Sequence, residues 1–182
     1  ALNVDGNLTF TTGTLDASGN DITVAGNWLN NGGKYTSGNN TVTFDGGTDQ
    51  TITTGGTTGT FDFNNITVNN SGGTVSLSTY ALDVDGIFTL TSGTFDANDL
   101  NVNFNGNFVM DGGTFKTGTW TITFGDLAGD TSTVNNGTFT IESDNSNDIN
   151  PAYGWTNAGG TVTYSTAASI TLRSTLSPFN NL

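Results

Sequence analysis

Short triplets of the form apolar–polar–apolar recur along the chain about every 20 residues. Their first apolar position holds Leu2, Ile22, Val42, Ile66, Leu82, Val102 and Ile122, and their second holds Val4, Val24, Phe44, Val68, Val84, Phe104 and Phe124. Because successive side chains of a strand point to opposite faces, each triplet predicts a short β-strand with one face buried. The Gly, Asn and Asp residues between triplets are typical of tight turns.

A longer repeat of 80 residues contains these triplets. Residues 2–44 align with residues 82–124 without a gap, and several glycines coincide, among them Gly26 with Gly106. This alignment divides the chain into long repeats at about 2–81 and 82–168, a loop inserted at about 142–151, and a non-repeating segment at about 169–182. We interpret residues 1–182 as a single domain.

One triplet cannot bury its apolar side alone, whereas copies stacked on one another form a continuous core. The pattern therefore predicts an all-β fold, a right-handed single-stranded parallel β-helix (β-solenoid) of roughly nine coils of about 20 residues. An antiparallel β-sandwich is the structural alternative, because it also has short alternating strands and frequent turns. A sandwich, however, does not need the same residue class to recur at the same phase. No segment shows the 3.6-residue periodicity of a helix.

The composition suits a thin rod with little interior. Only 33% of the residues are hydrophobic and 26 are glycine, while 12 Phe, 4 Tyr and 3 Trp argue against disorder. Lys and Arg number 3 against 16 Asp and Glu, a formal net charge of −13, which excludes nucleic acid as a partner. The chain has no cysteine, and no apolar run approaches the about 20 residues that span a bilayer, so membrane insertion is not expected.

Few residues are candidates for chemistry. There is no histidine, which removes the common hydrolase triads and most zinc sites, so we assign no catalytic residue and expect no enzyme. Asp5 and Asp85 occupy equivalent Asp-Gly turns, and Asp16 and Asp96 occupy equivalent Thr-x-Asp-Ala segments. Carboxylates stacked coil on coil would bind Ca²⁺, although Asp-Gly is also ordinary turn chemistry. No other cofactor is expected.

Three aromatic residues are candidates for a contact surface. Trp120 and Trp155 have no partner in the long repeat, and Phe179 lies in the non-repeating segment, where it could dock onto a neighbouring subunit. Trp28, in contrast, aligns with Phe108 and is expected in the core.

Two rival functions follow from the fold class rather than from a motif. Parallel β-helices host polysaccharide lyases and hydrolases, which need carboxylates near Arg or Lys in a groove, and the basic residues here are Lys34, Lys116 and Arg173. Thr-x-Thr pairs such as Thr41 and Thr43 would suit ice binding if they formed a continuous ladder. The pairs do not recur in every coil of the sequence pattern, and Thr suits any exposed strand face.

Two segments carry a family resemblance. VAGNWLNNGGKYTSGNNTVTF (24–44) resembles the repeats of large bacterial extracellular surface proteins, and FNNITVNNSGGTVSL (63–77) is similar to a linking segment of the same proteins. The resemblance implies a β-solenoid scaffold at the cell surface, of adhesin, filament or surface-layer type. It transfers no catalytic residue, because the matching positions are glycines, turn asparagines and core apolar residues.

The expected function is therefore that of an extracellular structural protein. The repeat begins at Leu2 with no cap before it, so either the chain belongs to a longer protein or its bare ends meet other copies. We expect identical subunits stacked head to tail in a surface filament or coat. The alternative is an adhesive stalk segment of a larger surface protein that binds glycans, and a polysaccharide-active enzyme or an ice-binding protein is less favoured.

Overall fold

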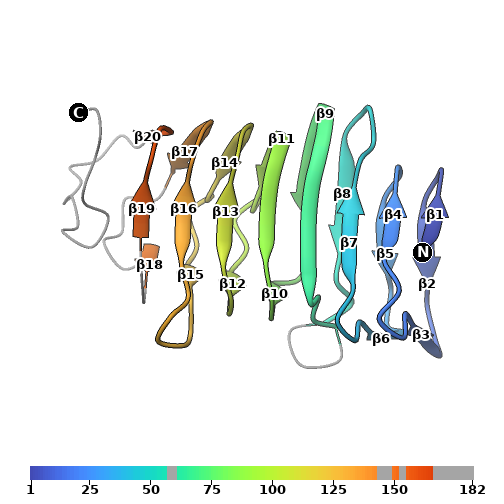
Figure 1. Cartoon of the computed structure of the whole chain (residues 1–182). Helices are drawn as coiled ribbons and strands as arrows, with labels where there is room; N and C mark the ends of the chain where they lie inside the picture. The colour runs from blue at the N-terminus through green and yellow to red at the C-terminus, as the bar shows by residue number, and fades with distance from the viewer. Residues whose placement is uncertain (57–60, 143–148, 152–154, 166–182) are drawn as a thin grey trace.

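In the computed structural model the chain is a rod of stacked three-sided coils (Figure 1). The structure describes residues 1–56, 61–142, 149–151 (main chain only) and 155–165. No helix occurs among these residues, and all strand pairs between them are parallel. The predicted β-solenoid is thus confirmed and the antiparallel sandwich is not the fold. About seven turns are present, and the right-handed winding and the count of nine coils stay predictions.

The strands lie on three faces, which we define by their members. Face A consists of β1 (Leu2–Val4), β4 (Ile22–Val24), β7 (Thr41–Phe44), the first halves of β9 (Asn65–Leu77) and β11 (Phe88–Asp96), β13 (Phe108–Met110), β16 (Ser132–Val134) and β19 (Trp155–Asn157). Face B consists of β2 (Leu8–Phe10), β5 (Trp28–Asn30), β8 (Gln50–Thr53), the second halves of β9 and β11, β14 (Thr114–Lys116), β17 (Thr138–Ile141) and β20 (Thr161–Tyr164). Face C consists of β3 (Thr14–Asp16), β6 (Lys34–Thr36), a bridge from Phe63 to Val84, β10 (Leu82–Val84), β12 (Val102–Phe104), β15 (Ile122–Phe124) and β18 (Ile149–Pro151).

The core is made of files of inward side chains that follow one another in register. Leu2, Ile22 and Val42 form one such file, as predicted, and Val4, Val24 and Phe44 form its neighbour. From Ile22 onward the inward residues of these two files are at most 2% exposed as far as Val68. Further along the rod the files become aromatic. The rings of Phe88 and Phe108 lie parallel with centroids 5.6 Å apart, which adds stacking to the burial of apolar area.

The file on face A does not pass from Ile66 to Leu82, where the sequence pattern placed it. Phe88 pairs with Ile66 instead, and Leu82 begins a separate file on face C that continues through Val102 and Ile122. The reason is the number of sides in the long repeat. Residues 2–81 supply β1 to β8, the Phe63 bridge and both halves of β9, which together make eleven sides. Since each coil has three sides, the second repeat begins one side out of phase with the first.

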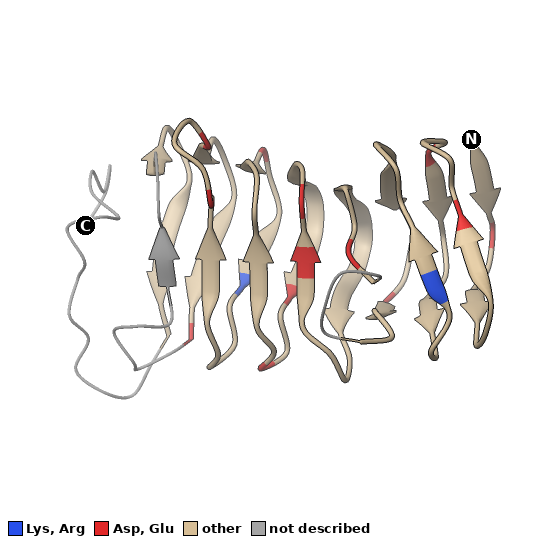
Figure 2. Cartoon of the chain, turned by 90° about the horizontal axis from the view of Figure 1, so that it is seen from below, with Lys and Arg blue, Asp and Glu red and all other residues tan. Residues whose placement is uncertain are grey.

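Several corners bring the main chains of adjacent coils very close together. A Cβ atom placed on Gly106 would lie 2.3 Å from the carbonyl oxygen of Gly86 in the preceding coil. Only glycine fits at such an approach, which explains why the repeat is most easily recognised by its glycines. Acidic side chains are distributed along the rod rather than gathered at one place (Figure 2).

Candidate functional site: the open edge of the first coil

The first coil, made of β1, β2 and β3, exposes side chains that are buried in the coils that follow. Leu2 is 44% exposed, whereas its register partner Ile22 is 2% exposed. Leu8 and Leu15 are only partly buried, although their partners Trp28 and Tyr35 belong to the core. The apolar interior of the rod is therefore open to solvent at this edge.

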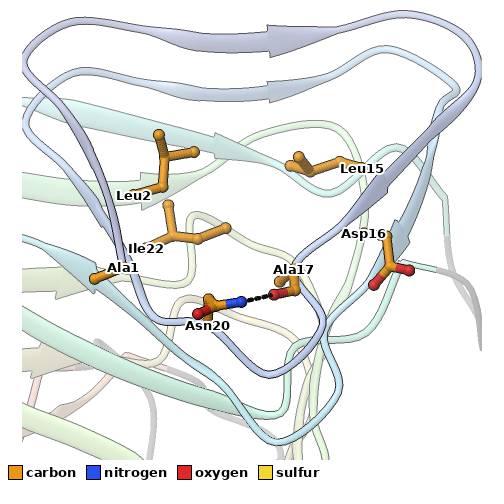
Figure 3. A pocket seen from close by; sticks show the side chains of 7 residues that line it. All are labelled: Ala1, Leu2, Leu15, Asp16, Ala17, Asn20 and Ile22. Carbon is orange, nitrogen blue, oxygen red and sulfur yellow. Dashed lines mark hydrogen bonds between the residues drawn. The ribbon is translucent and has the colours of Figure 1, made fainter.

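A hollow of about 310 Å³ lies at the open edge (Figure 3). Leu2, Leu15 and Ile22 contribute its apolar lining, and Asp16 and Asn20 lie at its rim. The Asn20 Nδ2 atom donates to the carbonyl oxygen of Ala17 at 3.0 Å, which fixes the corner that closes the triangle. The hollow has the outline of a coil, as Figure 3 shows, so the object that fits over it best is another coil.

Main-chain groups of the first coil also point away from the rod. The N–H of Leu8 donates to the carbonyl oxygen of Asn27, and the carbonyl oxygen of Phe10 accepts from the N–H of Asn31. Because alternate residues of a strand direct their main-chain groups to opposite neighbours, the N–H and C=O of Thr9 face the open side. A strand docked there would continue the parallel ladder.

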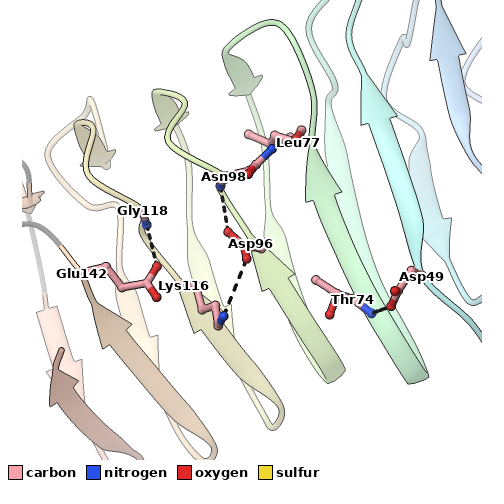
Figure 4. A network of polar contacts seen from close by, with 8 residues as sticks. All are labelled: Asp49, Thr74, Leu77, Asp96, Asn98, Lys116, Gly118 and Glu142. Atoms are coloured by element: carbon pink, nitrogen blue, oxygen red, sulfur yellow. Dashed lines mark hydrogen bonds and ion pairs between the residues drawn. The ribbon is translucent and has the colours of Figure 1, made fainter.

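Side-chain amides and carboxylates link coil to coil at the corners. Asn7 Oδ1 accepts the main-chain N–H of Asn27 at 2.8 Å, and Asn27 Oδ1 accepts that of Thr51 at 2.7 Å. Asp49 accepts the N–H of Thr74 at 2.9 Å in the same way (Figure 4). These bonds satisfy N–H groups that a sharp corner removes from the strand ladder. They also explain why the turns are rich in Asn and Asp.

Two buried polar clusters hold corners from the inside. Gln50 donates through Nε2 to the carbonyl oxygen of Val24 at 2.9 Å and accepts at Oε1 from Asn70 Nδ2 at 3.0 Å. Tyr35 donates its hydroxyl to Asn40 Oδ1 at 3.0 Å, and burial raises the pKa of Tyr35 to about 12. Each of these groups is hydrogen-bonded, so the clusters specify the coil geometry and are not reactive centres.

The four aspartates considered for Ca²⁺ are not brought together. Asp5 follows β1 on face A and Asp85 follows β10 on face C, while Asp16 ends β3 on face C and Asp96 ends β11 on face B. The change of phase between the long repeats separates each pair. Among the described residues there is no group of three or more His, Cys, Asp or Glu side chains able to hold a metal ion.

Each of these aspartates has a local partner. Asp16 accepts from the main-chain N–H of Ser18 at 2.8 Å, and Asp85 accepts from Asn105 Nδ2 at 3.0 Å. Asp96 accepts from the N–H of Asn98 at 2.8 Å and lies 3.8 Å from Lys116 Nζ (Figure 4). Their geometry is that of turn and ladder acceptors, which was the other interpretation of these residues.

The contact candidates separate in the structure. Trp120 is 56% exposed on the corner between β14 and β15. Trp155 is 8% exposed, with its ring edge-on to Phe124 and Phe139, so it belongs to the core and its assignment to a contact surface is wrong. Its lack of a repeat partner misled the sequence interpretation, because the residue in register with it is Ser132. Phe179 lies outside the described residues.

Two exposed apolar residues were missed from the sequence. Ile87 is 44% exposed between β10 and β11, and Leu127 is 66% exposed on the corner after β15. Ile87 stands where its sequence counterpart in the first repeat is Asn7. That replacement of a polar corner residue by an apolar one is a signal that could have singled it out.

Comparison with known proteins adds no relative: no protein-family model, no curated protein and no solved structure matches the chain. Within the part of the chain that the structure describes, no helix has the length and apolar character needed to cross a membrane.

Proposed function

We propose that the protein is an extracellular structural subunit that builds a surface filament or coat by stacking on further copies of itself. The observation that carries the proposal is the open edge of the first coil. There, Leu2 and the half-buried Leu8 and Leu15 occupy positions that are buried wherever another coil covers them. Covering this edge removes apolar surface from water and pairs the outward N–H and C=O groups of β1 to β3.

A second copy is the partner that fits this edge on all three sides at once. The edge requires three short strands about 4.8 Å away, each with its apolar residues directed inward at the same phase. The chain is itself made of such coils. Association of one end with another, without rotation that closes a ring, gives an open filament. The many acidic residues favour stacking along the axis, because the charges stay on the outside of the rod.

The surface location rests on the sequence. The segments at 24–44 and 63–77 resemble repeats of bacterial extracellular proteins, and a rod rich in Thr, Asn and Gly is suited to a scaffold role. In this proposal the chain binds no cofactor and catalyses no reaction.

Stacking is tested by blocking one main-chain donor at the open edge. Proline at position 9 removes the outward N–H and is compatible with an edge strand, whereas valine keeps the N–H and a similar volume. Wild-type protein and Thr9→Val should form rods that lengthen with concentration, measured by sedimentation velocity and negative-stain electron microscopy. Thr9→Pro should stay short while its circular dichroism spectrum stays the same.

Two results would contradict the proposal. One is wild-type protein that remains monomeric at every concentration, which would favour the adhesive stalk, where the edge is covered by a preceding coil of the same chain. The other is Thr9→Pro protein that lengthens as fast as Thr9→Val protein.

A further inference from the structure

Face A carries a file of outward side chains without a charge. Strand registers align its eight members coil on coil: Asn3, Thr23, Thr43, Thr67, Thr89, Val109, Thr133 and Thr156. Six of the eight are threonine, and we call this set the face A strip. The sequence pattern hid the strip, because its threonines come from different Thr-x-Thr pairs and single positions. On a chain with a formal net charge of −13, an uncharged file of this length is distinctive.

The corresponding outward files of the other faces carry charges. On face B, Asp96 and Lys116 are register partners in adjacent coils and form an ion pair (Figure 4). On face C, Asp83 is aligned with Asn103, whose Nδ2 donates to it at 2.7 Å. Face A is therefore the side on which another rod approaches with least electrostatic repulsion.

The middle of the face A strip is also apolar. Ile87, two residues before Thr89 and on the same side of the chain, is 44% exposed. Val109 lies in the strip directly beside Thr89, and the threonine methyl groups extend this apolar surface along the rod. The main chain at Ile87 is fixed, because its N–H donates to Asn65 Oδ1 at 2.8 Å. An exposed apolar group held on a regular sheet face is typical of an interaction surface.

We propose that the face A strip is the lateral contact between two copies of the protein, packed face to face. A second copy has the same coil spacing, so threonine, valine and isoleucine side chains of the two strips interdigitate along the whole contact. A face about 35 Å long and about 15 Å wide gives about 1,000 Å² of total buried area, the lower limit for a specific interface. One pair of rods is thus a weak dimer, and a filament that repeats the contact gains avidity.

This inference rests on the proposed function in one respect: lateral contacts turn stacked filaments into a coat. It uses a different surface from the open edge, and so it is tested in the Thr9→Pro background, where stacking is blocked. A failure of stacking and a failure of lateral pairing are then read from separate variants.

The chain has no cysteine, so single thiols can report on pairing. Thr67→Cys places a thiol near the middle of the face A strip, and Thr123→Cys places one at an outward, half-buried position of face C. With a short bis-maleimide, Thr67→Cys should give roughly tenfold more covalent dimer than Thr123→Cys, because pairing raises the effective concentration of the two thiols. Adding Ile87→Asp should abolish this excess, whereas Leu127→Asp, at an exposed residue of another corner, should not.

Three outcomes would overturn the proposal. The first is an equal dimer yield from Thr67→Cys and Thr123→Cys. The second is a dimer yield that Ile87→Asp leaves unchanged while the protein remains folded by circular dichroism. The third is monomeric protein that is retained in growing ice and loses this retention in Thr67→Lys, which would assign the face A strip to an ice surface.

Discussion

Gly113 lies directly against Gly93 of the preceding coil, so closely that a Cβ atom on Gly113 would be 2.4 Å from the Gly93 carbonyl oxygen. Gly113 also has a φ of +72°, which disfavours any L side chain. The main-chain oxygen that a methyl group would meet belongs to a paired coil and cannot move away without breaking the stack. Two independent costs therefore fall on this one position.

Gly113→Ala should lower the free energy of unfolding by roughly 2–5 kcal/mol, from the left-handed conformation and the steric clash together. The matched control is Gly13→Ala. Gly13 has a φ of +78° but nothing within 4 Å of its Cβ position, so it should lose only about 1 kcal/mol. Urea titration of both variants separates the two costs, and equal losses would show that the close approach to Gly93 does not exist in solution.

Ser132 is a polar residue in an otherwise apolar file. It lies in register with Phe108 on one side and Trp155 on the other, is 1% exposed, and its hydroxyl has no hydrogen-bond partner among the described residues. Ser132→Ala should raise the free energy of unfolding by about 1 kcal/mol, because a buried unpaired hydroxyl is removed. Ser92→Ala, at an exposed hydroxyl that donates to Asn69, should change it by less than about 0.5 kcal/mol. A clear loss of stability in Ser132→Ala would mean that the hydroxyl is bonded after all.

Tyr35 couples the stability of the second coil to alkaline pH. Its folded-state pKa is about 12, above the model value of 10.0, so its stabilising contribution is complete below pH 10 and is lost as the pH rises through 12. Tyr35→Phe should remove this alkaline loss and, near neutral pH, cost about 1 kcal/mol because Asn40 Oδ1 loses its donor. Thermal melts from neutral to strongly alkaline pH test both effects. The same alkaline loss in Tyr35→Phe and in Tyr80→Phe would refute the role of Tyr35.

Asp83 should make the protein more stable in mild acid. Burial raises the pKa of Asp83 above its ordinary value, the nearby Asp85 charge adds to this, and the hydrogen bond from Asn103 partly opposes it. A carboxyl group with a raised folded-state pKa favours folding below its unfolded value, and that contribution is lost as the pH rises through the folded value. Asp83→Asn keeps an oxygen acceptor for Asn103, so its melting temperature should exceed that of the wild type at neutral pH. The two melting temperatures should converge toward pH 4, and a constant difference across this range would contradict the assignment.

The sequence was sufficient for the local structure of this fold and insufficient for its long-range register. Triplets such as Leu2–Val4 and Ile22–Val24 predicted both a strand and its neighbour, because one side of a coil has the same apolar–polar–apolar pattern in every copy. That same uniformity concealed the change of phase. A triplet on face A looks like a triplet on face C, so only the number of sides between Ile66 and Leu82 distinguishes a stack from a corner.

The candidate sites depended on that register and were less predictable. Asp5 with Asp85, and Asp16 with Asp96, are equivalent in sequence but lie on different faces, because residues of the first repeat reappear one side earlier in the second. The face A strip shows the opposite case, since Thr67 and Thr89 have no common motif and yet are register partners. Pairing distance between coils varies from 20 residues, as at Val42 after Ile22, to 24 residues, as at Ile66 after Val42. Corner loops absorb the difference, and their lengths follow no simple sequence rule.

The eleven-sided repeat has a consequence for how such a rod can grow. Tandem duplication of this segment would advance the sequence around the axis by a third of a revolution each time, and three duplications would restore the original orientation. A protein lengthened in this way would show every side chain of the unit in turn to all directions around its axis. Insertion of a whole number of turns would instead confine each side chain to one direction. The odd number of sides thus distributes any adhesive or repulsive group evenly around a growing fibre.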